Sequence, residues 1–572
     1  MGGKYRIHVI LAAAALIFHL FEGFAFIRSA APTYDETVHL SSGYSYLETG
    51  RYLMNVMDHP PFSEMLSALP LLALHPKSFT AHPYFANLMP YHYGDLFLYQ
   101  NNSTPERLLN TARRFTFIVW TGLLAWFIWL FASRLESAAA AALSLAVFGL
   151  MPVFISNNAL ITTDAAAAVF YFGAFALAWQ FTAVRPVAKG VKGGKKAESP
   201  DGKKLAFWAA LAGAAAGFGL VSKFSLFIVP PMVAAFWLGD NLLAPRLKLP
   251  RLLGYIGVYF AACLLVVALV YKFDIGLYFD GLTETLKRLG KGRSSFAMGR
   301  YTLEGVWWYF PAALAVKTPL VALLGAAAGL WLALKNFRKD YLWLILPPAV
   351  YFAVSLNTKV QIGYRHIMPV MPFVAVLAGL ALARLLELRK GAWLAGGLLA
   401  LNAVSVSRAA PHYLAYFNEL AGGPANGYKL FVDSNLDWGQ DVIGVAAYLK
   451  GRGNPPVIFS YFGVARPESY GIDYTPLGVV SNIELNGTGA QVCGMKDVLL
   501  AVSATNLQGT YYPDKETFGW LKARRPVFSA GYSIFVYDLT SDKEGLERLA
   551  ALFDREGRNA DADCLYSLAA RK

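Results

Sequence analysis

Long apolar runs recur along the first 400 residues of the chain, and short polar loops separate them. A helix that crosses the hydrocarbon core of a bilayer needs about 20 apolar residues. About eleven runs approach that length, near residues 7–27, 113–132, 137–155, 160–182, 205–221, 224–239, 252–271, 319–335, 341–355, 367–383 and 392–407. The pattern predicts an α-helical protein with about eleven transmembrane helices.

The first apolar run follows Lys4 and Arg6, as the core of a signal peptide would. It is longer than the roughly 7–15 residues of such a core. Ser29-Ala30-Ala31 offers only a weak cleavage site before Asp35. We therefore expect an uncleaved first membrane helix.

The pattern changes near residue 409, where the long apolar runs end. PPVIFSYFG, KDVLLAVSA and YSIFVYDL are rich in β-branched and aromatic residues, which favours strands. DVIGVAAYLKG and KEGLERLAALFDREG have helical periodicity. We expect a transmembrane domain over residues 1–408 and a small α/β domain over residues 409–572.

Composition supports the membrane class, and charge gives an orientation. Of 572 residues, 56% are hydrophobic and 15% charged, and the formal net charge is +14. Lys and Arg cluster in alternate short loops, which the positive-inside rule places in the cytoplasm together with the N-terminus. These clusters are Lys4 and Arg6, Arg134, residues 185–204, PRLKLPR, KNFRKD and ARLLELRKG. The distribution argues against nucleic-acid binding, which needs one continuous basic surface.

This orientation places the remaining loops and the C-terminal domain outside the cell membrane. The outside segments are residues 32–62, 76–112, 157–163, 272–317, 357–366 and the tail after residue 408. Cys493 and Cys564 both lie in that tail and can pair if it faces an oxidising compartment, which the sequence leaves open.

Carboxylates stand where apolar runs meet the outside. Asp35 and Glu36 follow the first run, and Asp164 begins the fourth. Acidic residues at helix starts are also explained by the helix dipole. However, an ionisable group at the edge of a span is a candidate functional residue.

Cations also lie on this side, against the usual preference for Lys and Arg in the cytoplasm. Snorkelling of a long side chain explains any one of them, but several together indicate an anion such as a lipid phosphate. The set comprises Lys223, Lys317, Arg365 and His366.

Carboxylates beside cations suit the transfer of a group from a phosphate leaving group. A carboxylate can deprotonate an acceptor hydroxyl, while cations stabilise the departing phosphate. The outer carboxylates suit two roles, binding a divalent metal or acting as a general base, and the sequence leaves the metal open. No HExxH, Cys-rich metal site or GxSxG motif is present.

The motifs YDETVHLSSGYSYLETGRY…DHPPF, ITTDA, SKFS, KTP, YRHIMP and VDSNLDWGQD give the chain a family resemblance. It resembles the bacterial polyprenyl-phosphate-dependent GT-C glycosyltransferases, relatives of the protein O-mannosyltransferases and of the lipid A aminoarabinose transferase. The resemblance covers about residues 5–410. It implies a multi-span fold whose outer juxtamembrane helices form the site, a sugar donor on a polyprenyl phosphate, and inversion at the anomeric carbon.

The resemblance also implies roles for individual residues. Asp35 matches the base that activates the acceptor, Glu36 its acidic neighbour, and Asp164 a second aspartate that positions the acceptor or binds a metal. His59 matches the histidine of the HPP motif of the mannosyltransferase type. The aminoarabinose transferase has different residues before its PP, and this difference disfavours lipid A as the acceptor. By position and charge, the expected substrate-binding residues are His59, Lys223, Lys317, Tyr364, Arg365 and His366.

The expected partners are a polyprenyl-phosphate sugar, an acceptor that is protein, lipid or glycan, and membrane lipids. The expected location is the bacterial inner membrane, with the active site and the C-terminal domain in the periplasm. Two alternatives remain: a glycan polymerase or ligase with a diphosphate-linked donor, and a lipid or sugar transporter. A transporter predicts inverted repeats and charges near mid-span, whereas these charges lie at one edge.

Overall fold

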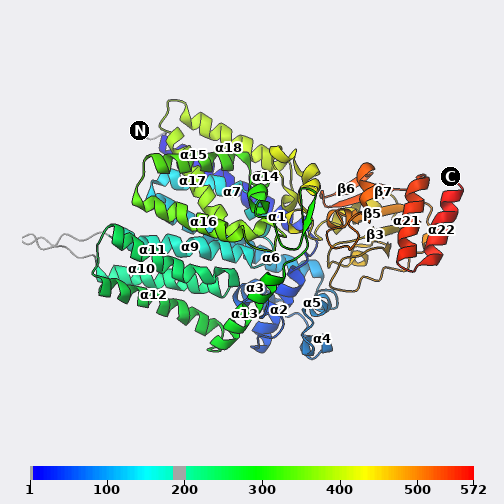
Figure 1. The fold of residues 1–572 in the computed structure, drawn as a ribbon, viewed down its shortest axis with the longest axis horizontal. Helices are drawn as coiled ribbons and strands as arrows, with labels where there is room; N and C mark the ends of the chain where they lie inside the picture. The colour runs from blue at the N-terminus through cyan, green and yellow to red at the C-terminus, as the bar shows by residue number, and fades with distance from the viewer. Residues whose placement is uncertain (1–3, 185–200) are drawn as a thin grey trace, which may run out of the picture.

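The computed structural model describes residues 4–184 and 201–572. A long helical bundle occupies most of the molecule, and a small sheet with its helices lies at one end of it (Figure 1). The N-terminus lies at the opposite end from the C-terminus. Most of the basic segment 185–204 predicted as a cytoplasmic loop, residues 185–200, lies outside the described residues.

The helices of the bundle follow the predicted apolar runs. The first half of the bundle contains α1 (Lys4–Ser29), α6 (Pro105–Leu135), α7 (Ala138–Gly149), α8 (Pro152–Asn157), α9 (Asp164–Ala183), α10 (Gly202–Leu220), α11 (Val229–Leu243) and α12 (Leu249–Val270). The second half contains α14 (Tyr309–Lys317), α15 (Leu320–Lys335), α16 (Leu342–Ser355), α17 (Met371–Leu385) and α18 (Gly391–Ser407). Short 3₁₀ helices η2 (Phe224–Ile228) and η4 (Tyr364–Val370) lead into α11 and α17.

Six of these helical segments are long and apolar enough to cross a membrane, or seven if α14 and α15, which meet at a bend of 113°, form one span. Helices α7 and α18 are shorter apolar helices. Large apolar side chains such as Leu264 and Leu265 on α12 and Leu401 on α18 are exposed, as expected of surfaces that face lipid. The protein is an integral membrane protein, and the total of about eleven spans stays a prediction.

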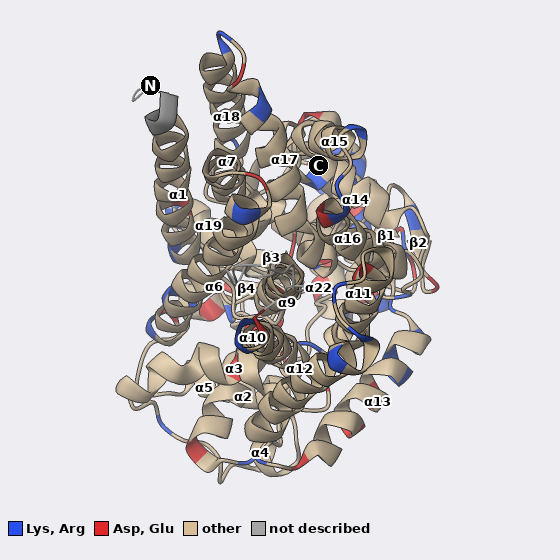
Figure 2. Ribbon diagram, turned by 90° about the vertical axis from the view of Figure 1, so that its left-hand side faces the viewer, with Lys and Arg blue, Asp and Glu red and all other residues tan. Residues whose placement is uncertain are grey.

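Charged residues are sparse along the bundle helices and gather at their ends and in the loops. Figure 2 shows this along the long axis, where most of the helical ribbon carries neither sign of charge. Helix α9 runs through the centre, and its most apolar stretch is completely buried. Its position makes the start of α9, at Asp164, an interior point of the bundle.

Short helices cover the end of the bundle nearest the sheet. They are α2 (Glu36–Thr49), α3 (Pro61–Ala68), α4 (Pro83–Ala86), α5 (Pro90–Tyr99) and α13 (Ile275–Lys291). An antiparallel hairpin of β1 (Ser295–Ala297) and β2 (Arg300–Thr302) follows α13. The family resemblance implies juxtamembrane helices, and the assignment of these short helices to that position stays a prediction.

The C-terminal region contains a five-stranded mixed sheet in the order β4-β3-β5-β7-β6. Strand β3 pairs in parallel with β4 and β5, whereas β7 is antiparallel to β5 and β6. The elements of this region are α19 (Val442–Lys450), β3 (Val457–Ser460), β4 (Tyr474–Pro476), β5 (Leu499–Ser503), α20 (Ala504–Leu507), β6 (Phe528–Ala530), β7 (Ile534–Asp538), α21 (Lys543–Arg555) and α22 (Asn559–Ala570). The predicted α/β class is confirmed, and the three predicted strands are β3, β5 and β7.

A disulfide joins Cys493 to Cys564 and ties α22 to the loop before β5. Cys263, in α12, is buried and free. The pairing that the sequence left open is therefore formed in this structure.

Candidate active site

The first residue of the central helix α9 is Asp164, and its carboxylate is fully buried. Lys223, from the turn between α10 and η2, donates to one carboxylate oxygen, and Arg365 donates to the other at 2.9 Å. The helix dipole also favours a negative charge at this end of a helix. A buried carboxylate needs such compensation, because desolvation alone would make its charge costly.

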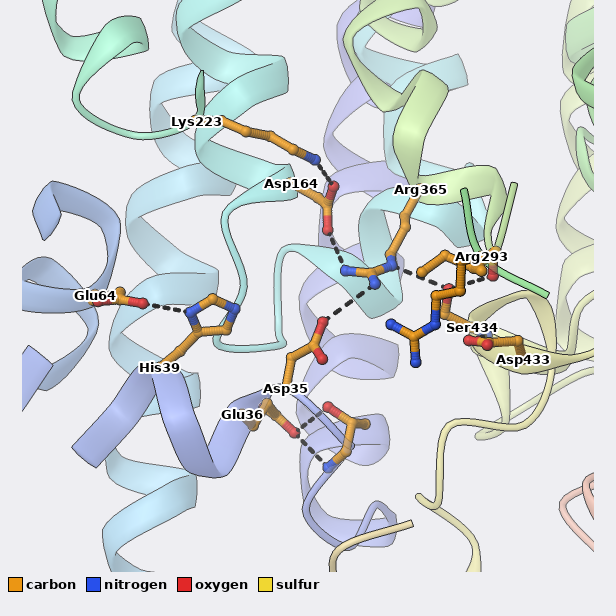
Figure 3. A network of polar contacts seen from close by, with 12 residues as sticks. Asp35, Glu36, His39, Glu64, Asp164, Lys223, Arg293, Arg365, Asp433 and Ser434 are labelled. Atoms are coloured by element: carbon orange, nitrogen blue, oxygen red, sulfur yellow. Dashed lines mark hydrogen bonds and ion pairs between the residues drawn. The ribbon is translucent and has the colours of Figure 1, made fainter. Parts of the chain in front are cut away.

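Arg365 connects Asp164 to Asp35 (Figure 3). Its Nη1 lies 2.9 Å from Asp164 Oδ2, and its Nη2 lies 3.2 Å from Asp35 Oδ2. Arg365 belongs to η4, which contains Pro369, and Pro372 follows in the first turn of α17. Each proline removes a backbone N–H donor, which favours a short 3₁₀ turn before α17. The geometry produces a row of alternating charges, Lys223, Asp164, Arg365 and Asp35.

Asp35 stands at the N-cap of α2, but its side chain makes no capping hydrogen bond. An aspartate in that position usually accepts from a backbone N–H of the first turn. Here the carboxylate turns to Arg365, and a quarter of the side-chain surface remains exposed. Asp35 is therefore the carboxylate of this row that a substrate can reach.

Glu36 lies in a different environment from its neighbour. Arg113 of α6 binds both of its carboxylate oxygens, at 2.8 and 2.5 Å, and both side chains are fully buried. Thr33 donates to Glu36 Oε2 through its backbone N–H and its hydroxyl, each at 2.9 Å. Burial by itself raises the pKa of Glu36, but Arg113 and these donors together hold it below its ordinary value. Its carboxylate is thus bound within the protein and does not face the exposed side of Asp35.

The two histidines near α2 meet each other. His39 Nδ1 lies 2.7 Å from Glu64 Oε1 of α3, and the ring of His59 packs edge-on against that of His39 at 4.8 Å. Burial lowers the pKa of His59 well below its ordinary value, and the nearby positive charges of His39 and Lys223 lower it further. His59 therefore presents a neutral imidazole on the side of Asp164 and Lys223.

Lys317, Tyr364 and Arg365 line one small pocket. Lys317 is buried and donates from Nζ to the carbonyl oxygens of Leu414 (2.8 Å) and Asn435. The Tyr364 hydroxyl lies 2.5 Å from Thr318 Oγ1. The structure places these three residues around one pocket, but the polar groups of Lys317 and Tyr364 already have partners within the protein.

His366 follows Arg365 in η4 and is half-buried. Its carbonyl oxygen accepts a hydrogen bond from Tyr351 of α16 at 3.2 Å. Within residues 4–184 and 201–572, its ring makes no hydrogen bond that the structure records. Its place in the site is fixed through the backbone.

Arg293 is a cation of this site that the sequence analysis did not single out. It precedes β1, is exposed, and points its guanidinium toward Asp35 (Figure 3). Its Nε donates to the hydroxyl of Tyr511 at 3.2 Å, and that hydroxyl donates to Asp433. The only sequence signal is the basic run GKGR in a loop predicted to lie outside, which does not mark one residue.

The described part of the chain holds no group of three or more His, Cys, Asp or Glu side chains arranged to bind a metal ion. Asp35 and Asp164 both bind the guanidinium of Arg365. The divalent metal considered from the sequence therefore stays a prediction.

A family model matches the part of the chain that contains Asp35, Asp164 and Lys223. Residues 30–278 match the model described as dolichyl-phosphate-mannose-protein mannosyltransferase. No curated protein matches the chain in sequence. The match covers α2, α3 and α9, the elements that carry the acidic residues of the site.

Most of the chain resembles a solved structure in fold. The Archaeoglobus fulgidus oligosaccharyltransferase in its apo form has a TM-score of 0.50 at 11% identity, covering 89% of this chain and 70% of that chain. ArnT from Cupriavidus metallidurans, bound to undecaprenyl phosphate, has a TM-score of 0.46 at 13% identity, covering 93% of this chain and 98% of that chain. At these identities the likeness concerns the fold. The chain is thus similar to the mannosyltransferase family over residues 30–278 and to an oligosaccharyltransferase in fold.

Proposed function

We propose that the protein transfers a sugar from a polyprenyl-phosphate donor to an acceptor hydroxyl, with inversion at the anomeric carbon. The observation that carries this proposal is the ion pair between Asp35 and Arg365, which places a partly exposed carboxylate beside a buried cation at one end of the bundle. The family model that matches residues 30–278 is described by a dolichyl-phosphate-linked mannose, which is a sugar on a polyprenyl phosphate. This match supports a lipid-phosphate donor for the chain.

In the proposed reaction Asp35 is the general base. The acceptor oxygen attacks the anomeric carbon, its proton passes to the carboxylate of Asp35, and the bond from that carbon to the phosphate oxygen breaks. A single displacement of this kind inverts the anomeric centre. The polyprenyl phosphate leaves with the negative charge, so cations close to it lower the barrier.

Arg365, Arg293 and Lys223 are the proposed cations for the donor phosphate. Arg365 lies between both aspartates, Arg293 points toward Asp35 from the other side, and Lys223 binds Asp164. Guanidinium groups suit a phosphate because they donate two parallel hydrogen bonds. His59 and His366 complete the proposed substrate-binding set, and Asp164 holds the cations in place.

Glu36, Lys317 and Tyr364 act in this proposal as positioning residues. The carboxylate of Glu36 fixes the start of α2 through Arg113 and Thr33. Lys317 donates from Nζ to the carbonyl oxygen of Asn435, and the backbone N–H of Tyr364 donates to the side-chain oxygen of Asn435. Glu36 follows, and Tyr364 precedes, a residue that we expect to touch the substrate. Lys317 holds the backbone next to Ser434, which binds Arg365.

We further propose that this end of the bundle faces the periplasm of a bacterial inner membrane, with residues 409–572 as an extracytoplasmic α/β domain. The alternating basic loops support that orientation. The disulfide between Cys493 and Cys564 agrees with it, because disulfides persist in oxidising compartments. The sugar and the acceptor class, whether protein, lipid or glycan, are left to experiment.

The test uses membranes that contain the wild type or the Asp35→Asn variant. A panel of labelled polyprenyl-phosphate sugars is supplied with a native membrane extract, with and without a chelator, and the label is followed. Label that reaches a new product only with the wild type supports the transferase and identifies donor and acceptor. Transfer only from diphosphate-linked donors would support the polymerase or ligase instead.

A further inference from the structure

The motif VDSNLDWGQD belongs to the C-terminal region, but it lies against the catalytic residues of the bundle. Its polar residues are buried, including Asp433, Ser434 and Asn435. Burial of so many polar groups is costly unless each has a partner. Their partners therefore indicate what the motif does.

Two adjacent residues of the motif hold the two arginines that approach Asp35. The Ser434 hydroxyl accepts from Arg365 Nε at 3.0 Å. The carboxylate of Asp433 accepts from the Tyr511 hydroxyl, which in turn accepts from Arg293 Nε. Asp433 has a φ of 57°, a left-handed conformation that aspartate tolerates better than most residues.

Trp438 covers the face of the Arg365 guanidinium. The guanidinium carbon lies 4.0 Å from the centroid of the Trp438 ring, and the ring is 2% exposed. A cation over an indole face is attracted by the ring quadrupole, more strongly when both groups are desolvated. Trp438 and Ser434 thus leave the two Nη atoms of Arg365 free for Asp35 and Asp164.

The same motif fixes the backbone that leads into Asp35. The backbone N–H of Ala31 donates to the carbonyl of Gln440 at 2.8 Å, and that of Tyr34 donates to the carbonyl of Trp438 at 3.1 Å. Gly363, two residues before Arg365, leaves no room for a side chain, because a Cβ there would lie 2.2 Å from Ser434 Oγ. The motif is therefore packed between the two chain segments that carry the ion pair.

We propose that residues 433–438 of the C-terminal region are an integral part of the catalytic centre, in which Ser434 and Trp438 position Arg365, and Asp433 positions Arg293 through Tyr511. The proposal rests on the proposed function, since it assigns these two arginines to the donor phosphate. It gives the C-terminal region a role in catalysis that neither the sheet nor the family match indicates.

The test measures binding of a radiolabelled polyprenyl phosphate to the full-length protein in detergent. We expect Trp438→Leu to weaken binding about tenfold, and Trp438→Phe, which keeps an aromatic face, to weaken it less than threefold. Phe553→Leu is the matched control, because Arg558 lies over the buried Phe553 ring at 4.4 Å on the far side of the same region. This control should bind as the wild type does.

A double-mutant cycle with Arg365→Lys separates this inference from the proposed function. If Trp438 acts through Arg365, Trp438→Leu should have little further effect once Arg365 is lysine. A full tenfold loss in that background, or an equal loss in Phe553→Leu, would overturn the positioning role. Unchanged binding in Arg365→Lys and Arg365→Ala would instead refute the phosphate assignment itself. Should Trp438→Leu fail to fold, Ser434→Ala replaces it in the same cycle.

Discussion

Asp35 and Glu36 are adjacent in the chain, but their carboxylates bind arginines from opposite halves of the bundle. Asp35 binds Arg365 at 3.2 Å and stays partly exposed, whereas Glu36 binds Arg113 at 2.5 Å and is completely buried. One helical start thus carries one carboxylate that is partly exposed and one that is buried and anchored. The two residues should therefore respond differently to the same chemical change.

Asp35→Asn should abolish transfer and leave the protein folded. The amide keeps the size of the side chain but cannot accept a proton, and a general base contributes about 10²–10⁴-fold to a rate. Turnover with a labelled donor checks this, together with the unfolding temperature as a measure of folding. Near-normal turnover in a folded variant would exclude Asp35 as the base.

Glu36→Gln should mainly lower stability. Removing one charge of a buried pair leaves Arg113 uncompensated, which costs about 3–5 kcal/mol. The unfolding temperature in detergent should fall markedly in Glu36→Gln and change little in Asp35→Asn. A stable but inactive Glu36→Gln protein would show that Glu36 takes part in the reaction directly.

Much of this site could be predicted from the sequence because its residues lie where apolar runs end. Asp35, Asp164, Lys223 and Arg365 each stand beside a span, on the same predicted side, and the structure brings all four into one row.

The contacts of Arg293 and Trp438 could not be predicted in this way. Trp438 meets Arg365 through the docking of the C-terminal region on the bundle, and neither periodicity nor loop charge encodes that docking. The lengths of the spans were also hard to judge. Pro152 begins a second short helix within one predicted run, and Pro319 stands at the 113° bend between α14 and α15.

Arg293→Ala should weaken donor binding more than acceptor binding. Arg293 is exposed and points toward Asp35, and Tyr511 links it to Asp433 by hydrogen bonds. Arg293→Lys keeps the charge but loses the paired donors of guanidinium, so we expect an intermediate effect. The KM values for donor and acceptor, measured separately, check this. A change confined to the KM for the acceptor would show that Arg293 binds the acceptor instead of the donor.

Replacing Cys493 and Cys564 together by serine should destabilise the C-terminal region without removing the catalytic groups. The bridge closes a loop between residues 71 positions apart, and such bridges contribute about 2–4 kcal/mol. Thermal unfolding checks the loss of stability, and turnover at low temperature checks that the catalytic groups are retained. Cys263→Ala is the control, because that thiol is free. Equal stability of the double variant and the wild type would contradict the expectation.

His412 should make stability depend on pH. Its Nδ1 lies 2.8 Å from Asp441 Oδ1 in the motif that contacts the site. Burial alone lowers the pKa of His412, but the hydrogen bond and the charge of Asp441 outweigh it and raise the pKa above its ordinary value of 6.5. A raised pKa means that the protonated form stabilises the fold. This contribution is complete below about pH 6.5 and is lost as the pH rises through the raised pKa of His412.

The difference in unfolding temperature between the wild type and His412→Asn should be largest near pH 6 and small at about pH 9. A difference that grows with pH would show that neutral His412 is the stabilising form.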